Sequence, residues 1–437
     1  MNGPRSLLSG VDFPALAATA LLVLIGILSI FSSGVNSEGT VVSGDYLKQI
    51  FWAVTGLALL VILVLVDYRQ IKDYAPLIYG LLVVLLVYTR LFGRVVNGAR
   101  AWIGIGDLGV QPSEFAKIAV ILFLARYLEG SVHDSHLRRI AASFGIVLLP
   151  MALILSQPDF GTALVFIPIL FFMLFVAGID RKYLLFLFLV CLLAGGLTIL
   201  PLWEKFILDR PTRVLKVLYE APYSWSILLA LAALFGLALW GFLSFKKRYY
   251  WWISFVFLAA TTGQGLALLA HKVLKEYQVM RLIVFMDPSI DPRGSGWNIL
   301  QSITAIGSGG FAGRGFLQGP QSHNRYIPQQ STDFIFSIIA EEWGFLGGIL
   351  VFGLFLVLLQ RCTVIMRSSR DDFALYITSG IMGMIFFHFM INTGMAMGIM
   401  PITGIPLFFL SYGGSSLLAV LSSIGLLLGI SARRYGS

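Results

Sequence analysis

Apolar segments long enough to cross a membrane recur along the whole chain of 437 residues, and they constrain its fold more than any other feature. A transmembrane helix needs about 20 mostly apolar residues. The sequence predicts twelve spans, near 13–33, 47–66, 74–92, 113–129, 138–156, 160–180, 182–202, 224–245, 249–271, 332–360, 373–398 and 412–432. Lipid offers no hydrogen-bond partners to an open backbone, so each span must be helical. We therefore predict an all-α, polytopic integral membrane protein.

The composition supports the same class of protein. Hydrophobic residues make up 58% of the chain and charged residues only 12%, whereas a soluble domain carries about 25% charged residues. The net charge of +9 therefore indicates orientation in the membrane and an anionic lipid substrate, and nucleic acid is not an expected partner. Cys191 and Cys362 lie far apart, and we expect neither a disulfide nor a metal site from them.

The distribution of basic residues predicts which side of the membrane is cytoplasmic. Both termini and the short loops on one side are basic, and by the positive-inside rule that side faces the cytoplasm. The first apolar run lacks a clear cleavage site, so we expect it to be a retained helix. The opposite side receives four longer segments, at 34–46, 90–112, 203–223 and 272–331. The last of these is predicted to be a large extracytoplasmic loop.

Acidic side chains at the outer ends of spans are the first candidates for function. Asp333 opens the span 332–360, where a carboxylate is costly and therefore functional by default. Asp159 lies in a Pro-Asp turn between two spans, and capping of the following helix is an equally good explanation for it.

Further polar residues gather in the segment 97–117. Its glycines and Pro112 disfavour helix, so Arg100 and Trp102 are expected in an ordered outer loop or interfacial piece. Glu114 and Lys117 follow on one face of the next helix, three residues apart, and neutralise each other. A structural ion pair and a role in a binding site both remain open for this pair.

Other polar positions are less specific. Arg281 and Arg293 have the guanidinium geometry that holds phosphate, although solvated or headgroup-binding arginines look the same in a sequence. His388 and Asn392 lie four residues apart on one helical face, and we favour helix–helix hydrogen bonding over catalysis for both. The prolines and glycines of 401–416 predict a broken re-entry, which survives at membrane depth only when buried in protein or facing a cavity.

Five motifs, taken in order, resemble those of the SEDS family (shape, elongation, division and sporulation proteins). They are QPSEFAK at 111–117, QPDFGT at 157–162, GSGGFAGRGF at 307–316, TDFIFSIIAEEWG at 332–344 and PITGIPLFFLSYGGSS at 401–416. The resemblance covers nearly the whole chain. GPQSHNRYIPQQSTDFIF at 319–336 is more similar to the RodA branch, which acts in cell elongation, than to the FtsW division branch.

The resemblance implies a peptidoglycan glycosyltransferase that polymerises lipid II outside the bacterial cytoplasmic membrane, together with a class B penicillin-binding protein. It implies that Asp333 is the essential aspartate and that Glu114 and Lys117 belong to a membrane cavity. Arg100 and Trp102 match the Arg-Ala-Trp of the family's outer loop.

The chain also departs from the family pattern. The family has about ten spans where we predict twelve, so residues 1–437 are expected to form one membrane domain with a two-helix insertion at 203–271. Gln329 stands where many relatives have glutamate, and Ser331 stands where a histidine is common. Both changes remove titratable neighbours of Asp333.

These residues predict a mechanism in which Asp333 takes the proton of the attacking sugar hydroxyl as general base. Fixed cations stabilise the leaving pyrophosphate, with Arg100, Lys117, Arg281 and Arg293 as candidates in that order. A divalent cation such as Mg²⁺ or Mn²⁺ on the pyrophosphate would be held by Asp159 or Asp333. A single displacement inverts the anomeric centre.

Two other functions compete with this one. A lipid II flippase or transporter would suit many spans and broken helices, but no repeated half is present and the polar motifs collect on one side. A non-catalytic scaffold would make substitutions of Asp333 silent.

Overall fold

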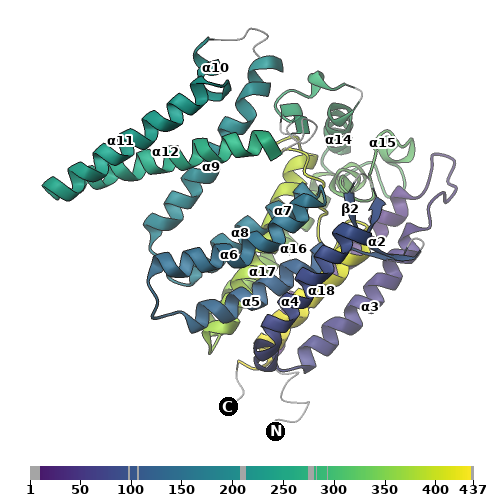
Figure 1. Ribbon diagram of the computed structural model, residues 1–437. Coiled ribbons are helices and arrows are strands. Elements are labelled where there is room, and N and C mark those ends of the chain that lie inside the picture. The colour runs from purple at the N-terminus through teal and green to yellow at the C-terminus, as the bar shows by residue number, and fades with distance from the viewer. Residues whose placement is uncertain are drawn as a thin grey trace. The chain divides into compact units, whose positions relative to one another are not determined.

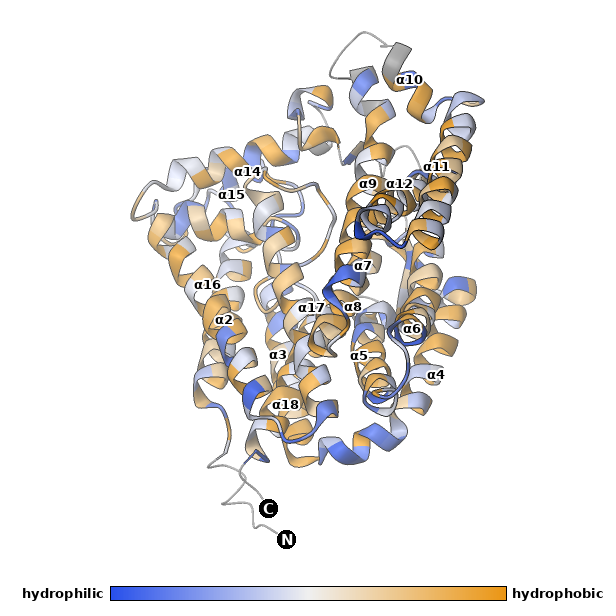
Figure 2. Cartoon of the chain, turned by 90° about the vertical axis from the view of Figure 1, so that its left-hand side faces the viewer, coloured by the Kyte–Doolittle hydropathy of each residue, from blue (hydrophilic) through white to orange (hydrophobic). Residues whose placement is uncertain are grey.

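The computed structural model describes residues 10–96, 99–105, 108–206, 213–273, 280–281, 283–292 and 294–434. Ten of its helices are long and apolar enough to cross a membrane. Figure 2 shows apolar residues along most of the length of these helices, with hydrophilic residues concentrated at their ends and in the connections. The predicted all-α polytopic membrane fold is confirmed.

Each of the twelve predicted spans corresponds to helix, but the count is approximate. The predicted span 113–129 is α5 (Pro112–Gly130), which carries four charged residues, and 160–180 is two short helices, α7 (Phe160–Leu164) and α8 (Phe166–Val176). The ten long apolar helices match the other ten predicted spans.

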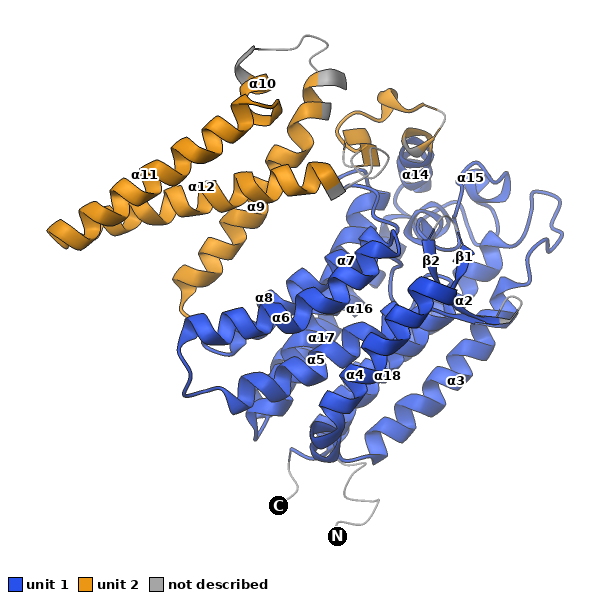
Figure 3. Ribbon diagram, in the orientation of Figure 1, with its two compact units in different colours: residues 1–178, 298–437 blue, residues 179–297 orange. Residues whose placement is uncertain are grey.

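The chain forms two compact units, residues 1–178 with 298–437, and residues 179–297 (Figure 3). The first unit begins with α2 (Phe13–Ser33), α3 (Asp45–Leu65) and α4 (Tyr68–Phe92). After a small sheet and α5 come α6 (His136–Ser156), α7 and α8. The C-terminal part holds most of α14 (Ser295–Gly309), then α15 (Pro320–His323), α16 (Ile335–Ser368), α17 (Asp372–Ala396) and α18 (Gly414–Ala432) (Figure 1).

The second unit contains α9 (Arg181–Phe206), α10 (Arg213–Tyr219), α11 (Tyr223–Phe245), α12 (Arg248–Val273) and the 3₁₀ turn η1 (Pro288–Ile290). Helix α12 packs against both α9 and α11. The described part of the predicted insertion 203–271 therefore consists of the end of α9 with α10, α11 and most of α12. The domain boundaries themselves stay a prediction.

Helix α18 is the centre of the first unit, because its apolar length is wholly buried. It packs against α3, α5 and α16. Gly425 and Gly429 allow α3 to approach closely, since a methyl group on either would come within about 3 Å of a backbone oxygen of Leu60 or Leu63. Helix α17 packs against α5, α8 and α16 in turn.

A small three-stranded antiparallel sheet follows α4, in the segment where the sequence predicts an ordered loop or interfacial piece. Its strands are β1 (Arg94–Val96), β2 (Ala99–Ile105) and β3 (Leu108–Val110), in the order β1-β2-β3. Trp102 pairs with Arg94 across the first ladder. The glycines of this segment disfavour helix, as predicted, but the strands are too short for their alternation to be recognised in the sequence.

Candidate functional site

Asp333 lies immediately before α16, in a turn of backbone that other segments hold in place. Its N–H donates to the carbonyl of Gln329 at 3.0 Å, and its own carbonyl accepts from Nδ2 of Asn392 at 2.9 Å. The residue is partly exposed, whereas every residue from 334 to 342 is buried. Asp333 is therefore the carboxylate at the edge of this buried segment that solvent or a substrate can reach.

The broken segment 401–413 forms a wall beside Asp333. Ser411 Oγ donates to the carbonyl of Thr332 at 2.5 Å, and the Tyr412 N–H donates to the carbonyl of Ser331 at 2.8 Å. Gly404 has φ of +71°, and a methyl group added there would lie 3.8 Å from Oδ2 of Asp333. The glycine thus supplies both the left-handed backbone and open space next to the carboxylate.

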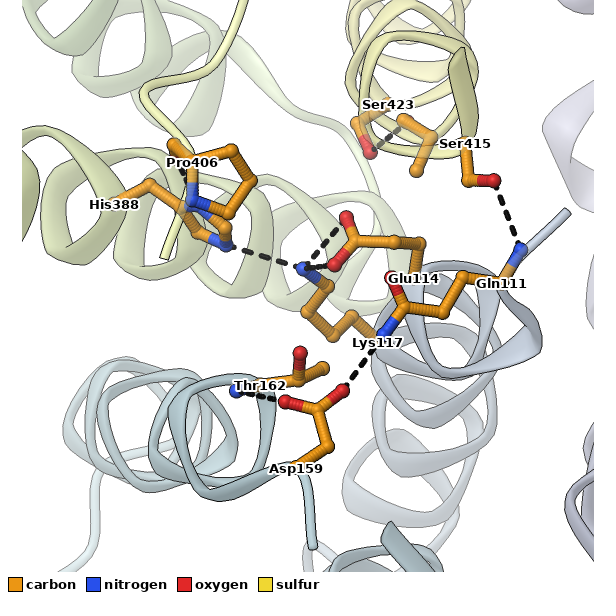
Figure 4. Close-up of polar contacts among 10 residues, drawn as sticks. Gln111, Glu114, Lys117, Asp159, Thr162, His388, Pro406, Ser415 and Ser423 are labelled. Carbon is orange, nitrogen blue, oxygen red and sulfur yellow. Dashed lines mark hydrogen bonds and ion pairs between the residues drawn. The ribbon is translucent and has the colours of Figure 1, made fainter. Parts of the chain in front are cut away.

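Glu114 and Lys117 form a fully buried ion pair on α5 (Figure 4). Lys117 Nζ lies 2.9 Å from both carboxylate oxygens of Glu114 and 3.1 Å from Nε2 of His388 on α17. Lysine only donates, so Nε2 of His388 accepts and its Nδ1–H donates to the carbonyl of Pro406 at 2.9 Å. All three ammonium protons of Lys117 are used, and none is left for a phosphate in this conformation.

Asp159 caps α7 as the structural explanation predicts, with Oδ1 accepting from the Thr162 N–H at 3.1 Å. Its other oxygen accepts from Nε2 of Gln111 at 2.7 Å (Figure 4). Burial raises the pKa of the Asp159 carboxyl, against the hydrogen bonds from Thr162 that lower it. Gly161 in the same helix packs against the Thr403 carbonyl, so α7 and Asp333 flank the same segment, 401–406.

Of the other predicted residues, two lie on β2, one lies in the second unit and one falls outside the described residues. Arg100 is exposed on β2, where Nη1 donates to the Leu91 carbonyl at 3.4 Å. Trp102 is partly buried and packs on Gly109 of the neighbouring strand. Arg281 is exposed in the second unit, and Arg293 lies outside the described residues.

The donor set does not fit a preformed metal centre. The described residues contain no group of three or more His, Cys, Asp or Glu side chains that would hold a metal ion. Both oxygens of Asp159 already accept hydrogen bonds from protein groups. We therefore derive no chemical step through a metal.

Two residues of α17 contribute more to the site than the sequence indicates. His388 makes the predicted helix–helix hydrogen bond to α5, and it also holds segment 401–406. Asn392 instead donates to two backbone carbonyls, those of Asp333 and Ile405. Their spacing of four residues showed that they share a face, but the partners lie in distant segments and leave no local signal.

The fold and this site together define an integral membrane protein in which a broken, buried segment presents one aspartate at the edge of its polar interior. The family model for cell cycle proteins of the FtsW, RodA and SpoVE type matches residues 14–241 and 229–436. The chain belongs to this family, as its motifs predict.

Individual relatives match over almost the whole length. The chain is 50% identical over 426 residues to "Peptidoglycan glycosyltransferase RodA" of Treponema pallidum (strain Nichols), covering 98% of both proteins. It is similar to a chain solved for "Structural coordination of polymerization and crosslinking by a peptidoglycan synthase complex", with a TM-score of 0.68, 28% identity and coverage of 98% and 99%. The crystal structure of a variant of the rod shape determining protein RodA of Thermus thermophilus gives a TM-score of 0.61 at 26% identity, with the same coverage.

Proposed function

We propose that this chain is a peptidoglycan glycosyltransferase of the RodA type, which polymerises lipid II into glycan strands during cell-wall elongation. The observation that carries the proposal is the 50% identity, over 98% of both chains, to a protein named for this activity. The partly exposed position of Asp333 supports it, because a catalytic carboxylate has to be reached by its substrate.

The reaction joins a sugar hydroxyl of one lipid II to the anomeric carbon of the growing glycan. Asp333 takes the hydroxyl proton as the new C–O bond forms, and the bond from the anomeric carbon to the lipid pyrophosphate breaks. Attack opposite the leaving group inverts the centre. The missing side chain at Gly404 leaves room for a sugar hydroxyl beside Oδ2.

The departing pyrophosphate carries the electron pair of the broken bond and needs cations. Arg100 is exposed and available for this role. Lys117 contributes only if substrate binding draws it away from Glu114 or His388. Arg281 and Arg293 stay candidates on the chemistry of their side chains alone, because a guanidinium group binds phosphate oxygens. A divalent cation bound mainly by substrate oxygens is a separate expectation, tested by comparing polymerisation with and without EDTA.

The partner and the site's location follow from the same proposal. A class B penicillin-binding protein would cross-link the new strands, as the named synthase complex combines polymerisation with cross-linking. Both termini would face the cytoplasm of a bacterium and Asp333 the outer side of the cytoplasmic membrane, in accord with the positive-inside rule. A flippase is not favoured by the names of the relatives.

The test is polymerisation of labelled lipid II by the purified full-length protein, with and without a class B partner. Moenomycin is added to suppress classical transglycosylases. We expect polymer from the wild type and none from Asp333→Asn, which keeps the size of the side chain but removes the base. Movement of lipid II across liposomes without any polymer would instead establish the transporter. Polymer from the variant at the wild-type rate would remove Asp333 from the mechanism.

A further inference from the structure

Asn392 joins the backbone of Asp333 to the neighbouring segment 401–406 through two hydrogen bonds. Its Nδ2 lies 2.9 Å from the carbonyl oxygen of Asp333 and 2.8 Å from that of Ile405. Both partners are acceptors, so the amide orientation is fixed by chemistry and both N–H groups are used. The side chain is fully buried on α17.

The two carbonyls belong to segments that lack regular structure. Residues 331–334 form turns, and 401–406 has no helix or strand. Ile405 is followed by Pro406, whose carbonyl is held by His388 one turn earlier on α17. One face of α17 therefore holds the successive carbonyls of Ile405 and Pro406. Through Asn392 it also holds the backbone of Asp333.

Satisfying buried carbonyls is a sufficient structural reason for such an amide, since an unpaired one is costly at membrane depth. The geometry also indicates a role in placing the carboxylate, because the single nitrogen of Asn392 bridges Asp333 to Ile405, which is next to Gly404. A methyl group at Gly404 would lie 3.8 Å from Oδ2 of Asp333. The same bridge thus sets the distance between the carboxylate and the open space where a reacting hydroxyl would lie.

We infer that Asn392 is a positioning residue, which holds Asp333 at the correct distance from segment 401–406 for proton transfer. The inference rests on the proposed function. Asn392 does not touch substrate and takes no proton. Its loss removes one of the hydrogen bonds that hold the backbone of Asp333 and leaves the carboxylate present, and a displacement of about 1 Å is enough to cost on the order of 10²-fold in rate.

The test compares Asn392→Leu, which keeps the branched shape of the side chain and removes both donors, with Thr393→Val. Thr393 is equally buried on the same helix, but its hydroxyl bonds only to the Phe389 carbonyl within that helix. The readouts are kcat and KM for lipid II polymerisation by the full-length protein, its melting temperature, and hydrogen exchange of peptides covering 329–334 and 403–412.

For Asn392→Leu we expect kcat to fall about 10²-fold with KM unchanged, and exchange to become faster in the two peptides only. Thr393→Val should behave as the wild type. Equal losses in both variants, or a change in KM alone, would overturn the inference. If Asn392→Leu does not fold, Ser411→Ala removes the neighbouring bond to Thr332 and should give a smaller fall in kcat of the same kind.

Hydrogen exchange separates this inference from the proposed function. A wild type that makes no polymer would overturn the proposed function. Unchanged exchange at 329–334 in Asn392→Leu would overturn the positioning role, whatever the activity of the protein.

Discussion

Lys117 has no contact with solvent, and its charge is tolerated because Glu114 and His388 accept all three of its ammonium protons. Removing one member of a buried ion pair leaves the other uncompensated and costs about 3–5 kcal/mol. We expect Lys117→Met to lower the melting temperature strongly. Glu114→Gln combined with Lys117→Met should recover much of the loss, because no buried charge remains.

Thermal unfolding of the single and double variants in detergent checks this expectation. Gly130→Ala serves as the control on the same helix, because its added methyl group meets no atom within 4 Å. A single variant as stable as the wild type would mean that water or lipid headgroups reach this pair.

At the scale of single residues, the free-energy cost of a charge in an apolar segment identifies candidate site residues in the sequence. The tertiary contacts of these residues are not visible there. A charge in an apolar run is expensive, so Asp333, Glu114 and Lys117 could be selected from the sequence alone. Besides the local bond to Gln329, Asp333 is held by Asn392, which lies 59 positions away on α17, and its neighbours Ser331 and Thr332 are held by residues of 401–413. Only the folded chain brings these segments together.

At the scale of elements, α16 is the helix whose path the sequence did not predict. It runs from Ile335 to Ser368 but is interrupted at Gly344, where φ is +66° and ψ is −159°. Segment 310–323 packs against this interruption, with the N–H groups of Arg314 and Gly315 donating to the carbonyls of Glu341 and Glu342. The Glu341 carboxylate in turn accepts from the N–H groups of Gln321 and Ser322.

We therefore expect Gly344→Ala to release segment 310–323 from α16. A methyl group at this position would lie 2.3 Å from the backbone nitrogen of Gly313, and the positive φ adds strain on the order of 1–3 kcal/mol. Gly353→Ala is the matched control, because it lies on the same helix with no atom within 4 Å of the added carbon.

Limited proteolysis of the two variants provides the measurement. Faster cleavage within 310–323 for Gly344→Ala, but not for Gly353→Ala, is the expected result. Identical digestion patterns would show that the docking does not depend on the interruption. Hydropathy located this helix because its residues are apolar, but a kink made by one glycine carries no periodic signal.

At the scale of the whole molecule, the number of helices that cross the membrane decides on which side each connection lies. Ten helices qualify by length and composition, whereas α5 carries Glu114 and Lys117 inside the protein. Ten crossing helices and the twelve predicted spans are both even numbers, so either arrangement places the two termini on the same side. They differ at the connection after α5, which lies on the same side as the termini only if α5 crosses.

Cysteine labelling of intact cells with a membrane-impermeant maleimide distinguishes the two arrangements. The background carries Cys191→Ser, since Cys191 is exposed and Cys362 is buried. We expect Phe311→Cys to be labelled in intact cells, because this residue is exposed and the proposed function places it on the outer side. His133→Cys, in the exposed connection between α5 and α6, should be labelled only after permeabilisation. Labelling of His133→Cys in intact cells would mean that α5 does not cross. Helix α6 would then cross the membrane in the direction opposite to that in the twelve-span arrangement.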